Sequence, residues 1–315
     1  MRIFITGIDG FVGRHLAARL AADGHAVEGF ALHASEVAGA GWVAACDVRD
    51  AGAVSRTLAE ARPERIVHLA GQTSNAAGFE SPAETFAVNA LGTIHVLEAA
   101  RESAAGRVLL VTTGEVYGPR EPSQGPVPET ASLAPVTPYA VSKAAQDLIG
   151  RQYARGFGLD VVLARSFPHT GPGQDPRFVF PSVAQRIALA EAGQGPADIE
   201  LGDLAVTRDM SDVRDVVEAY VALLDRGEAG EAYNVCHGEG RTLEEWLAEF
   251  ADEARCPVRF VSRRERFRPA DVAWMVGDPK KIHERTGWRP RYAWRDTVHD
   301  MMEYWRTRTR VHANA

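Results

Sequence analysis

RIFITGIDGFVGRHLAARL, residues 2–20, is the stretch that decides the fold. Gly7, Gly10 and Gly13 follow a short apolar run and open an amphipathic helical pattern. Between a strand and a helix, such glycines allow a tight turn, close approach of the backbone to a pyrophosphate, and close helix–strand packing. The first amides of the helix are donors for phosphate oxygens. The stretch therefore predicts a dinucleotide-binding unit with cofactor contacts at Gly7, Gly10, Phe11, Val12 and Gly13.

The same alternation of apolar runs and helical patterns continues along the chain. Further runs are HAVEGFAL (25–32), RIVHLAG (65–71) and RVLLVTT (107–113). Continuous apolar strands separated by helices are typical of a parallel sheet covered on both faces. We predict an α/β fold, with a Rossmann-type doubly wound parallel sheet in residues 1–167. Residues 168–315 are predicted to form mainly a smaller α/β substrate-binding part, and the helix near residues 212–226 to pack back on the first domain.

Composition narrows the possible partners. With a net charge of −7 and 45% apolar residues, the 315-residue chain has no basic field that would attract nucleic acid. No apolar run approaches the ~20 residues of a membrane span, and the N-terminus lacks the pattern of a signal peptide. The three cysteines match no metal or disulfide spacing. We expect a cytoplasmic protein with no metal, nucleic-acid or membrane partner.

Two stretches carry groups suited to proton chemistry. TPYAVSKAAQDL (137–148) places Tyr139 and Lys143 four residues apart, on one face of a predicted helix. The ammonium can lower the pKa of the phenol by stabilising the phenolate. VTTGEVYG (111–118) places Thr113 and Glu115 at the end of a predicted strand. These groups predict a catalytic site.

Together these motifs resemble the extended short-chain dehydrogenases/reductases, in their sugar-nucleotide branch. The resemblance implies that Thr113 bonds a substrate oxygen, Tyr139 exchanges a proton, and a nicotinamide transfers hydride. NAD versus NADP stays open, because the second predicted strand ends in Leu32-His33 without a deciding Asp or Arg. The implied cofactor contacts also include Asp47, Val48, Leu69, Ala70, Gly71, Gln72 and Asn89, together with Tyr139 and Lys143. For Asp47, the alternative to a cofactor contact is that its side chain caps the N-terminus of a helix.

The second half resembles GDP-4-keto-6-deoxymannose reductases in runs such as RSFPHTGPGQ (165–174) and VTRDMSDVRDVVEAY (206–220). In that family an Asn stands where this chain has Pro168. Arginine side chains in the second half can each donate two parallel hydrogen bonds to a diphosphate. Their alternative role is to form salt bridges at the surface. His169 is equally suited to loop packing. The substrate contacts implied by the resemblance are Thr73, Ser74, Glu115, His169, Arg177, Arg208, Arg268 and Asp271.

The reaction depends on the role of Glu115. Many 4,6-dehydratases that resemble this chain read Thr-Asp-Glu, whereas here the middle residue is Gly114. We therefore expect Glu115 to support rather than perform catalysis. The predicted reaction is NAD(P)H-dependent reduction of the C4 ketone of a nucleoside-diphosphate 4-keto-6-deoxyhexose, converting GDP-4-keto-6-deoxy-D-mannose to GDP-D-rhamnose.

Three alternatives remain open at this point: a GDP-mannose 4,6-dehydratase, a nucleoside-diphosphate-sugar 4-epimerase, and a non-enzymatic NAD(P)-sensing regulatory module. The resemblance also implies a homodimer. Its four-helix interface would be built from the helix that carries Tyr139 and the helix before it.

Overall fold

The main sheet has seven strands in the order β11-β6-β5-β4-β1-β2-β3, and every neighbouring pair is parallel. The structure is a computed structural model that describes residues 1–266 and 272–313. The predicted doubly wound parallel sheet is confirmed. Its strands are β1 (Arg2–Thr6), β2 (Ala26–Ala31), β3 (Trp42–Ala45), β4 (Arg65–His68), β5 (Arg107–Thr113), β6 (Val161–Ser166) and β11 (Ala232–Val235).

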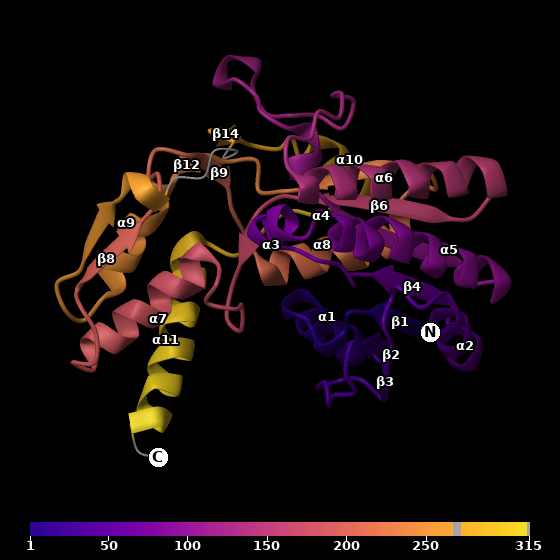
Figure 1. The fold of residues 1–315 in the computed structure, drawn as a ribbon, viewed down its shortest axis with the longest axis horizontal. Coiled ribbons are helices and arrows are strands. Elements are labelled where there is room, and N and C mark those ends of the chain that lie inside the picture. Colours follow the sequence, from indigo (N-terminus) through magenta and orange to yellow (C-terminus); the bar gives the residue numbers. More distant parts are fainter. Residues whose placement is uncertain (267–271, 314–315) are drawn as a thin grey trace.

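Helices cover both faces of this sheet (Figure 1). Because side chains alternate along a strand, Ile5 and Phe4 of β1 enter two different cores. The core around Ile5 lies under α1 (Phe11–Ala22), α8 (Val213–Arg226) and α10 (Lys280–Thr286). The core around Phe4 lies under α2 (Ala51–Ala61), α5 (Gly92–Glu102) and α6 (Pro138–Phe157).

The chain reverses its winding direction between β1 and β4, which are neighbours in the sheet. In doubly wound sheets, ligands bind outside the carboxyl ends of the strands at such a switch point. The loops that follow β1, β4 and β5 meet there. The short elements on this side are α3 (Asn75–Glu80), α4 (Pro82–Phe86), the π-helical turn η1 (Ala87–Leu91), the 3-10 turn η2 (Gly114–Tyr117), β7 (His169–Thr170) and β10 (Ser211–Asp212).

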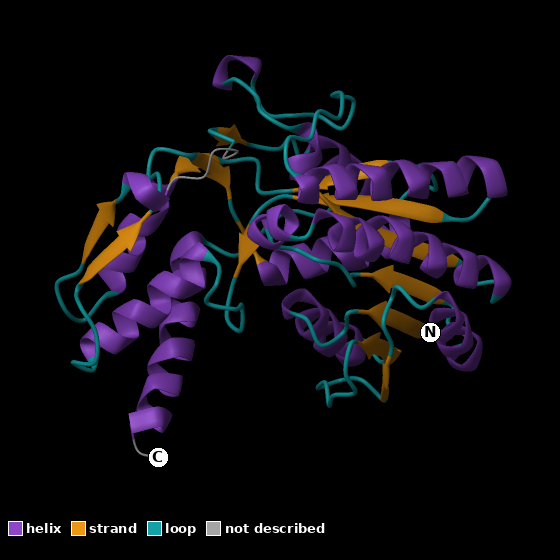
Figure 2. Cartoon of the chain, viewed as in Figure 1, coloured by secondary structure: helices purple, strands orange, loops and turns teal. Residues whose placement is uncertain are grey.

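A second, smaller group of helices and strands lies beside the main sheet (Figure 2). This group has its own apolar core. Phe180, Trp246, Phe250 and Trp294 form its aromatic centre, with ring centroids 4.8–6.1 Å apart. Its elements are α7 (Val179–Glu191), α9 (Leu243–Glu253), α11 (Trp294–Ala313), the parallel pair β8 (Asp198–Leu201) and β13 (Arg259–Ser262), and the three-stranded sheet of β9 (Thr207–Asp209), β12 (Gly240–Thr242) and β14 (Trp274–Met275). The turns η3 (Pro122–Gln124) and η4 (Arg264–Arg266) complete the described elements.

The main sheet also draws on sequence far beyond residue 167. β11 pairs with β6 as the edge strand of the sheet, and α8 packs on β5 and β6. The chain therefore leaves the main sheet, forms part of the smaller group, and returns. Among the described helices, none combines the length and apolar character that a membrane span requires.

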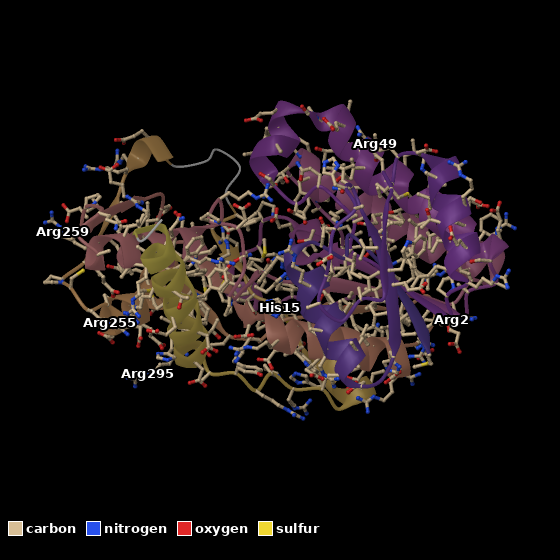
Figure 3. The ribbon with its side chains drawn as sticks, turned by 90° about the horizontal axis from the view of Figure 1, so that it is seen from below. Arg2, His15, Arg49, Arg255, Arg259 and Arg295 are labelled. Atoms are coloured by element: carbon tan, nitrogen blue, oxygen red, sulfur yellow. The ribbon has the colours of Figure 1, made fainter. Side chains whose placement is uncertain are left out.

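A side-chain contact from α1 reaches the connection between the two groups. The His15 ring nitrogen Nε2 lies 2.9 Å from the carbonyl oxygen of Pro172, in the loop after β7. Figure 3 shows His15 between the helices around the main sheet and the group that carries Arg255, Arg259 and Arg295. The helix that begins at the glycine turn thus contacts the connection into the smaller group.

We predict that Gly13→Ala destabilises the protein. A Cβ atom at Gly13 would lie 2.5 Å from the Gly7 carbonyl oxygen and 2.6 Å from that of Ile8, so helix and turn would have to separate. The expected loss of unfolding free energy is about 1–3 kcal/mol, measured by urea denaturation. Gly52→Ala is the control, because exposed Gly52 lies in α2, where alanine should add up to about 1 kcal/mol. Equal effects of both substitutions would contradict the packing role of Gly13.

Candidate active site

The glycine turn after β1 has the geometry that a dinucleotide requires. Gly7 has a φ of +70°, which favours glycine, and its amide donates to the Phe30 carbonyl at 2.8 Å. A Cβ atom on Gly7 would also lie 2.9 Å from the backbone of Ala70. Gly10 is the N-cap of α1 and provides no side chain to cap the helix. The first amides of α1 are thus left for another acceptor, and a phosphate group is a suitable one.

Asn89 joins the loop after β4 to α6. The wholly buried side chain lies in the π-helical turn η1. Its Oδ1 accepts from the Gln72 amide at 2.8 Å, and its Nδ2 donates to the Gln72 carbonyl at 3.1 Å and to Ser142 Oγ at 2.9 Å. A Cβ atom on Gly71 would lie 3.0 Å from Asn89 Oδ1 and 3.4 Å from Lys143 Nζ. The predicted cofactor residues Gly71, Gln72, Asn89 and Lys143 therefore lie together.

A second buried chain of hydrogen bonds runs through His68 at the end of β4. Thr93 Oγ1 donates to the Asn89 carbonyl at 2.7 Å, so this hydroxyl can only accept from His68 Nε2, 3.1 Å away. Because burial lowers the pKa of His68 and keeps the ring neutral, Nδ1 then carries no proton and accepts from Thr6 Oγ1 at 2.7 Å. Thr6 Oγ1 in turn accepts from the Ala70 amide at 3.0 Å. The chain fixes His68 as the neutral Nε2–H tautomer.

Tyr139 and Lys143 lie on α6 as the sequence predicts. Thr137 caps this helix by accepting from the Ala140 amide at 3.1 Å, and Pro138 occupies its first turn. Both Tyr139 and Lys143 are buried. Burial raises the pKa of Tyr139 and nearby Glu115 raises it further, whereas a hydrogen bond with Thr113 lowers it. Thr113, Tyr139 and Glu115 therefore converge.

The Lys143 ammonium has two neutral partners. Nζ donates to Gln146 Oε1 at 2.8 Å and to the Val111 carbonyl at 3.2 Å. Burial lowers the pKa of Lys143 to about 8, because the ammonium has lost its water shell. Lys143 follows Tyr139 by four residues on α6, about 6 Å along the helix axis.

Glu115 is held in place by Asn75. Asn75 Nδ2 donates to Glu115 Oε2 at 2.9 Å, and Asn75 Oδ1 accepts from Thr137 Oγ1 at 2.8 Å. The preceding residue, Gly114, has no room for a side chain: a Cβ atom there would lie 2.9 Å from three ring carbons of Phe167. This arrangement places one carboxylate beside Tyr139 and excludes a second at position 114.

Asp47 does not cap a helix, so that alternative is wrong. The cap of α2 is Asp50, which accepts from the Ala53 amide at 2.9 Å. Asp47 instead forms an ion pair with Arg49, with 2.6 Å between Oδ2 and Nη2, and this pair lowers the pKa of Asp47. Asp47 lies between β3 and α2, on the carboxyl side of the sheet, and the neighbouring Val48 is buried.

The residues predicted to contact the substrate differ from one another in exposure and in hydrogen-bond partners. Ser74 caps α3, and Thr73 beside it is exposed. The His169 ring stacks on Phe11 of the glycine turn at 6.3 Å between centroids. Its Nδ1 lies 2.9 Å from the Phe167 carbonyl oxygen, so His169 packs in a loop and also borders the cofactor turn.

The predicted arginines differ in exposure. Arg177 is exposed and pairs with Asp175 at 3.6 Å. Arg208 is half-buried on β9, and its Nη1 donates to the Thr207 carbonyl at 2.9 Å. The adjacent Asp209 accepts from the backbone amides of His237, Gly238 and Gly277. Burial raises the pKa of Asp209 to about 7. Arg268 and Asp271 lie outside the described residues.

Sequence reasoning missed four polar residues around the site: Ser142, Asn75, His68 and Gln146. Ser142 and Gln146 lie within four residues of the predicted catalytic pair, and their helical spacing from it could have indicated them. His68 ends a predicted strand, where a polar residue after an apolar run is a signal. Asn75 follows the predicted loop directly, but its bond to Glu115 joins segments 40 residues apart and has no local signal.

We predict that His68 remains neutral, with its proton on Nε2, between pH 5 and 9. Burial and the charge of Lys143 lower its pKa to about 3, so protonation begins only in strong acid. Long-range ¹H–¹⁵N NMR spectra of histidine-labelled protein should show one ring with a protonated Nε2 that does not titrate. The signal is assigned by its loss in His68→Gln. A titrating ring, or a proton on Nδ1, would contradict the hydrogen-bond directions.

Comparison with known proteins supports a relationship along nearly the whole chain. The family model described as GDP-mannose 4,6 dehydratase matches residues 4–301. The GDP-6-deoxy-D-mannose reductase of Pseudomonas aeruginosa is 35% identical, with 98% of each chain covered. The solved structure of RMD from Pseudomonas aeruginosa complexed with NADPH has a TM-score of 0.87 and 34% identity, covering 98% of this chain and 99% of that one.

Relatives with another activity are nearly as similar. The UDP-glucose 4-epimerase of Thermus thermophilus, solved in complex with NAD, has a TM-score of 0.88 and 31% identity, covering 97% of this chain and 99% of that one. The reaction therefore has to be argued from the site. Since the family model and the reductase both cover almost the entire sequence, this chain belongs to the GDP-mannose 4,6-dehydratase family of extended short-chain dehydrogenases/reductases.

Proposed function

We propose that this protein reduces the C4 ketone of a nucleoside-diphosphate 4-keto-6-deoxyhexose with NAD(P)H. The preferred reaction is GDP-4-keto-6-deoxy-D-mannose to GDP-D-rhamnose. The similarity to a GDP-6-deoxy-D-mannose reductase along the whole chain supports the substrate class. Relatives solved with NADPH and with NAD support a nicotinamide cofactor without deciding between the two.

The residues have distinct roles in this proposal. The nicotinamide, when bound, supplies the hydride that adds to the carbonyl carbon. Tyr139 gives its phenolic proton to the carbonyl oxygen, and the phenolate recovers a proton from solvent afterwards. Thr113 holds that oxygen by a hydrogen bond, and the positive charge of Lys143 stabilises the phenolate. Glu115, held by Asn75, orients a sugar hydroxyl or braces the loop.

The choice between reduction and dehydration rests on the lack of space for a side chain at position 114. Removal of water from a hexose needs an acid and a base close to the reacting carbons, whereas reduction needs one proton and one hydride. The Phe167 ring lies where a side chain at position 114 would begin. This favours a reductase over a 4,6-dehydratase that uses a carboxylate there. The buried groups of Thr113, Tyr139 and Lys143 also favour an enzyme over a sensing module, because a module that only binds the cofactor needs no proton donor.

The remaining roles are proposed from the sequence and the geometry together. Residues 1–167, with the helix at 213–226 packed on them, hold the cofactor, and residues 168–315 mainly bind the sugar nucleotide. A cytoplasmic location stays a prediction. The proposed cofactor residues are Gly7, Gly10, Phe11, Val12, Gly13, Asp47, Val48, Leu69, Ala70, Gly71, Gln72, Asn89, Tyr139 and Lys143. The proposed substrate residues are Thr73, Ser74, Glu115, His169, Arg177, Arg208, Arg268 and Asp271.

We predict that the protein oxidises NADPH or NADH in the presence of GDP-4-keto-6-deoxy-D-mannose, seen as loss of absorbance near 340 nm. Tyr139→Phe should lower kcat by about 10²–10⁴-fold, since it removes the proton donor and little volume. Tyr292→Phe, at a partly exposed position on the surface, is the matched control. Conversion of GDP-mannose without net cofactor change would instead identify a dehydratase. Cofactor binding without turnover of any 4-keto sugar would identify a sensing module.

We further propose a homodimer through α6 and the helical segment η1–α5. Val141 and Leu148 lie seven residues apart on one face of α6, with 39% and 59% of their surface exposed. Leu91, at the end of η1, is 47% exposed. Exposed apolar side chains grouped on neighbouring helices are typical of a contact between subunits.

Leu148→Asp should therefore shift the protein from dimer to monomer, because it places a charge in the apolar contact. Size-exclusion chromatography with light scattering measures the mass directly. Leu32→Asp is the control, since Leu32 is 60% exposed but follows β2, in another part of the fold. A wild-type protein that is monomeric at micromolar concentration would overturn the proposal.

A further inference from the structure

Lys143 differs from the other lysines of this chain in its partners. The sequence has three lysines: Lys143, Lys280 and Lys281. Lys281 pairs with Glu231 at 2.6 Å, and Lys280 lies 3.8 Å from Glu284. Lys143 is the most buried of the three, yet within the described part of the chain both of its acceptors are uncharged oxygens. A buried ammonium without a carboxylate is costly, which suggests that its uncompensated charge is used.

Gln146 provides the shorter of these two bonds. Its side chain is wholly buried one turn along α6, and Oε1 accepts from Lys143 Nζ at 2.8 Å. Its Nε2 has no partner among the described residues. Rotating the amide would turn the NH₂ group towards the ammonium, so Lys143 fixes the orientation of Gln146 although a donor is left unpaired.

Other charged groups near α6 are already engaged. Asp147 pairs with Arg165 at 2.8 Å and with Arg151 at 2.9 Å. On α5, Glu98 accepts from the hydroxyl of Tyr153, at 2.6 Å. Neither carboxylate is available to Lys143.

The titratable groups that face Lys143 or Tyr139 come from three other elements. They are His68 on β4, Glu115 on η2 and Tyr220 on α8. Of these, the carboxylate of Glu115 raises the pKa of Tyr139. Among the described residues, Gln146 is the side chain that accepts a hydrogen bond from the ammonium.

We propose that Gln146 is a positioning residue for the proposed reduction: its neutral carbonyl holds the Lys143 ammonium without cancelling the charge, which stays directed at the Tyr139 phenol. A glutamate has the same shape and the same acceptor but carries a negative charge. At 2.8 Å from Nζ it would form an ion pair, and the field at the phenol one turn away would fall. The kinetic part of this inference rests on the proposed function, whereas the charge state of Lys143 does not.

The first test measures Lys143 itself. NMR of protein labelled with ¹³C- and ¹⁵N-lysine should give three lysine signals, and Lys143 is assigned by Lys143→Met. In Gln146→Glu its titration midpoint should rise by about one pH unit or more, because a carboxylate favours the ammonium. In Gln146→Met the midpoint should fall, because the ammonium loses an acceptor. Lys280 and Lys281 serve as internal references and should not change.

The control variant is Gln194→Glu, which makes the same substitution at an exposed position just after α7, outside α6. It should leave the Lys143 midpoint and kcat unchanged. Gln146→Glu should lower kcat at pH 7 by roughly tenfold while it moves the alkaline limit of activity to higher pH. Gln146→Met should move that limit to lower pH, and this opposite direction separates positioning from simple loss of packing.

The outcomes separate this inference from the proposed function. Lys143 midpoints that are the same in wild type, Gln146→Glu and Gln146→Met would overturn the role of Gln146, whatever the substrate. The midpoint could instead rise in Gln146→Glu and fall in Gln146→Met while the wild-type protein reduces no 4-keto sugar. That result would support the effect of Gln146 on the charge of Lys143 and would refute the reductase activity. If Gln146→Glu does not fold, Gln146→Met still tests the inference. A lower Lys143 midpoint in that variant would support it, and an unchanged midpoint would contradict it.

Discussion

The buried side chain of Asn89 holds together the two segments on which the site depends. It binds both backbone groups of Gln72 and the hydroxyl of Ser142, so hydrogen bonds link the loop after β4 to the helix that carries Tyr139 and Lys143. The π-helical turn of η1 places the amide at that depth, and π-helical turns are frequent at functional sites. The His68 chain binds the carbonyl of Asn89 and connects it to Thr6 at the end of β1. The glycine turn, the loop and α6 are thus connected by one set of buried hydrogen bonds.

Much of this arrangement could be predicted because its signals are local. The glycines at 7, 10 and 13, and the spacing of Tyr139 and Lys143, each describe one turn of backbone in a few residues. β3 was not predicted, because WVAA (42–45) is an alanine-rich edge strand without the β-branched pattern. α7 and α11 were also missed. Proline interrupts the pattern of α7 at position 181, and α11 is strongly polar.

Site residues that depend on tertiary contacts could not be predicted from spacing. The bond from Asn75 to Glu115 joins a helix N-terminus to the end of β5, and the contact of His169 with Phe11 joins segments more than 150 residues apart. The contact between Gly114 and the Phe167 ring also depends on the tertiary structure. The sequence shows only a glycine, and the fold shows that the ring leaves no room for a side chain there. In a family whose members reduce, dehydrate or epimerise sugar nucleotides, such contacts carry the information about the reaction.

The return of the chain to the main sheet has a consequence for engineering. Because β11 and α8 come from beyond residue 167, a fragment cut there would lack an edge strand and the helix that covers β5 and β6. Such a fragment would expose the apolar surface of Val162 and Leu109, which the intact chain buries completely. The unit built on the main sheet therefore cannot be transplanted into a chimaera as one contiguous piece; the graft would need at least two separate stretches of sequence, residues 1–167 and 213–235.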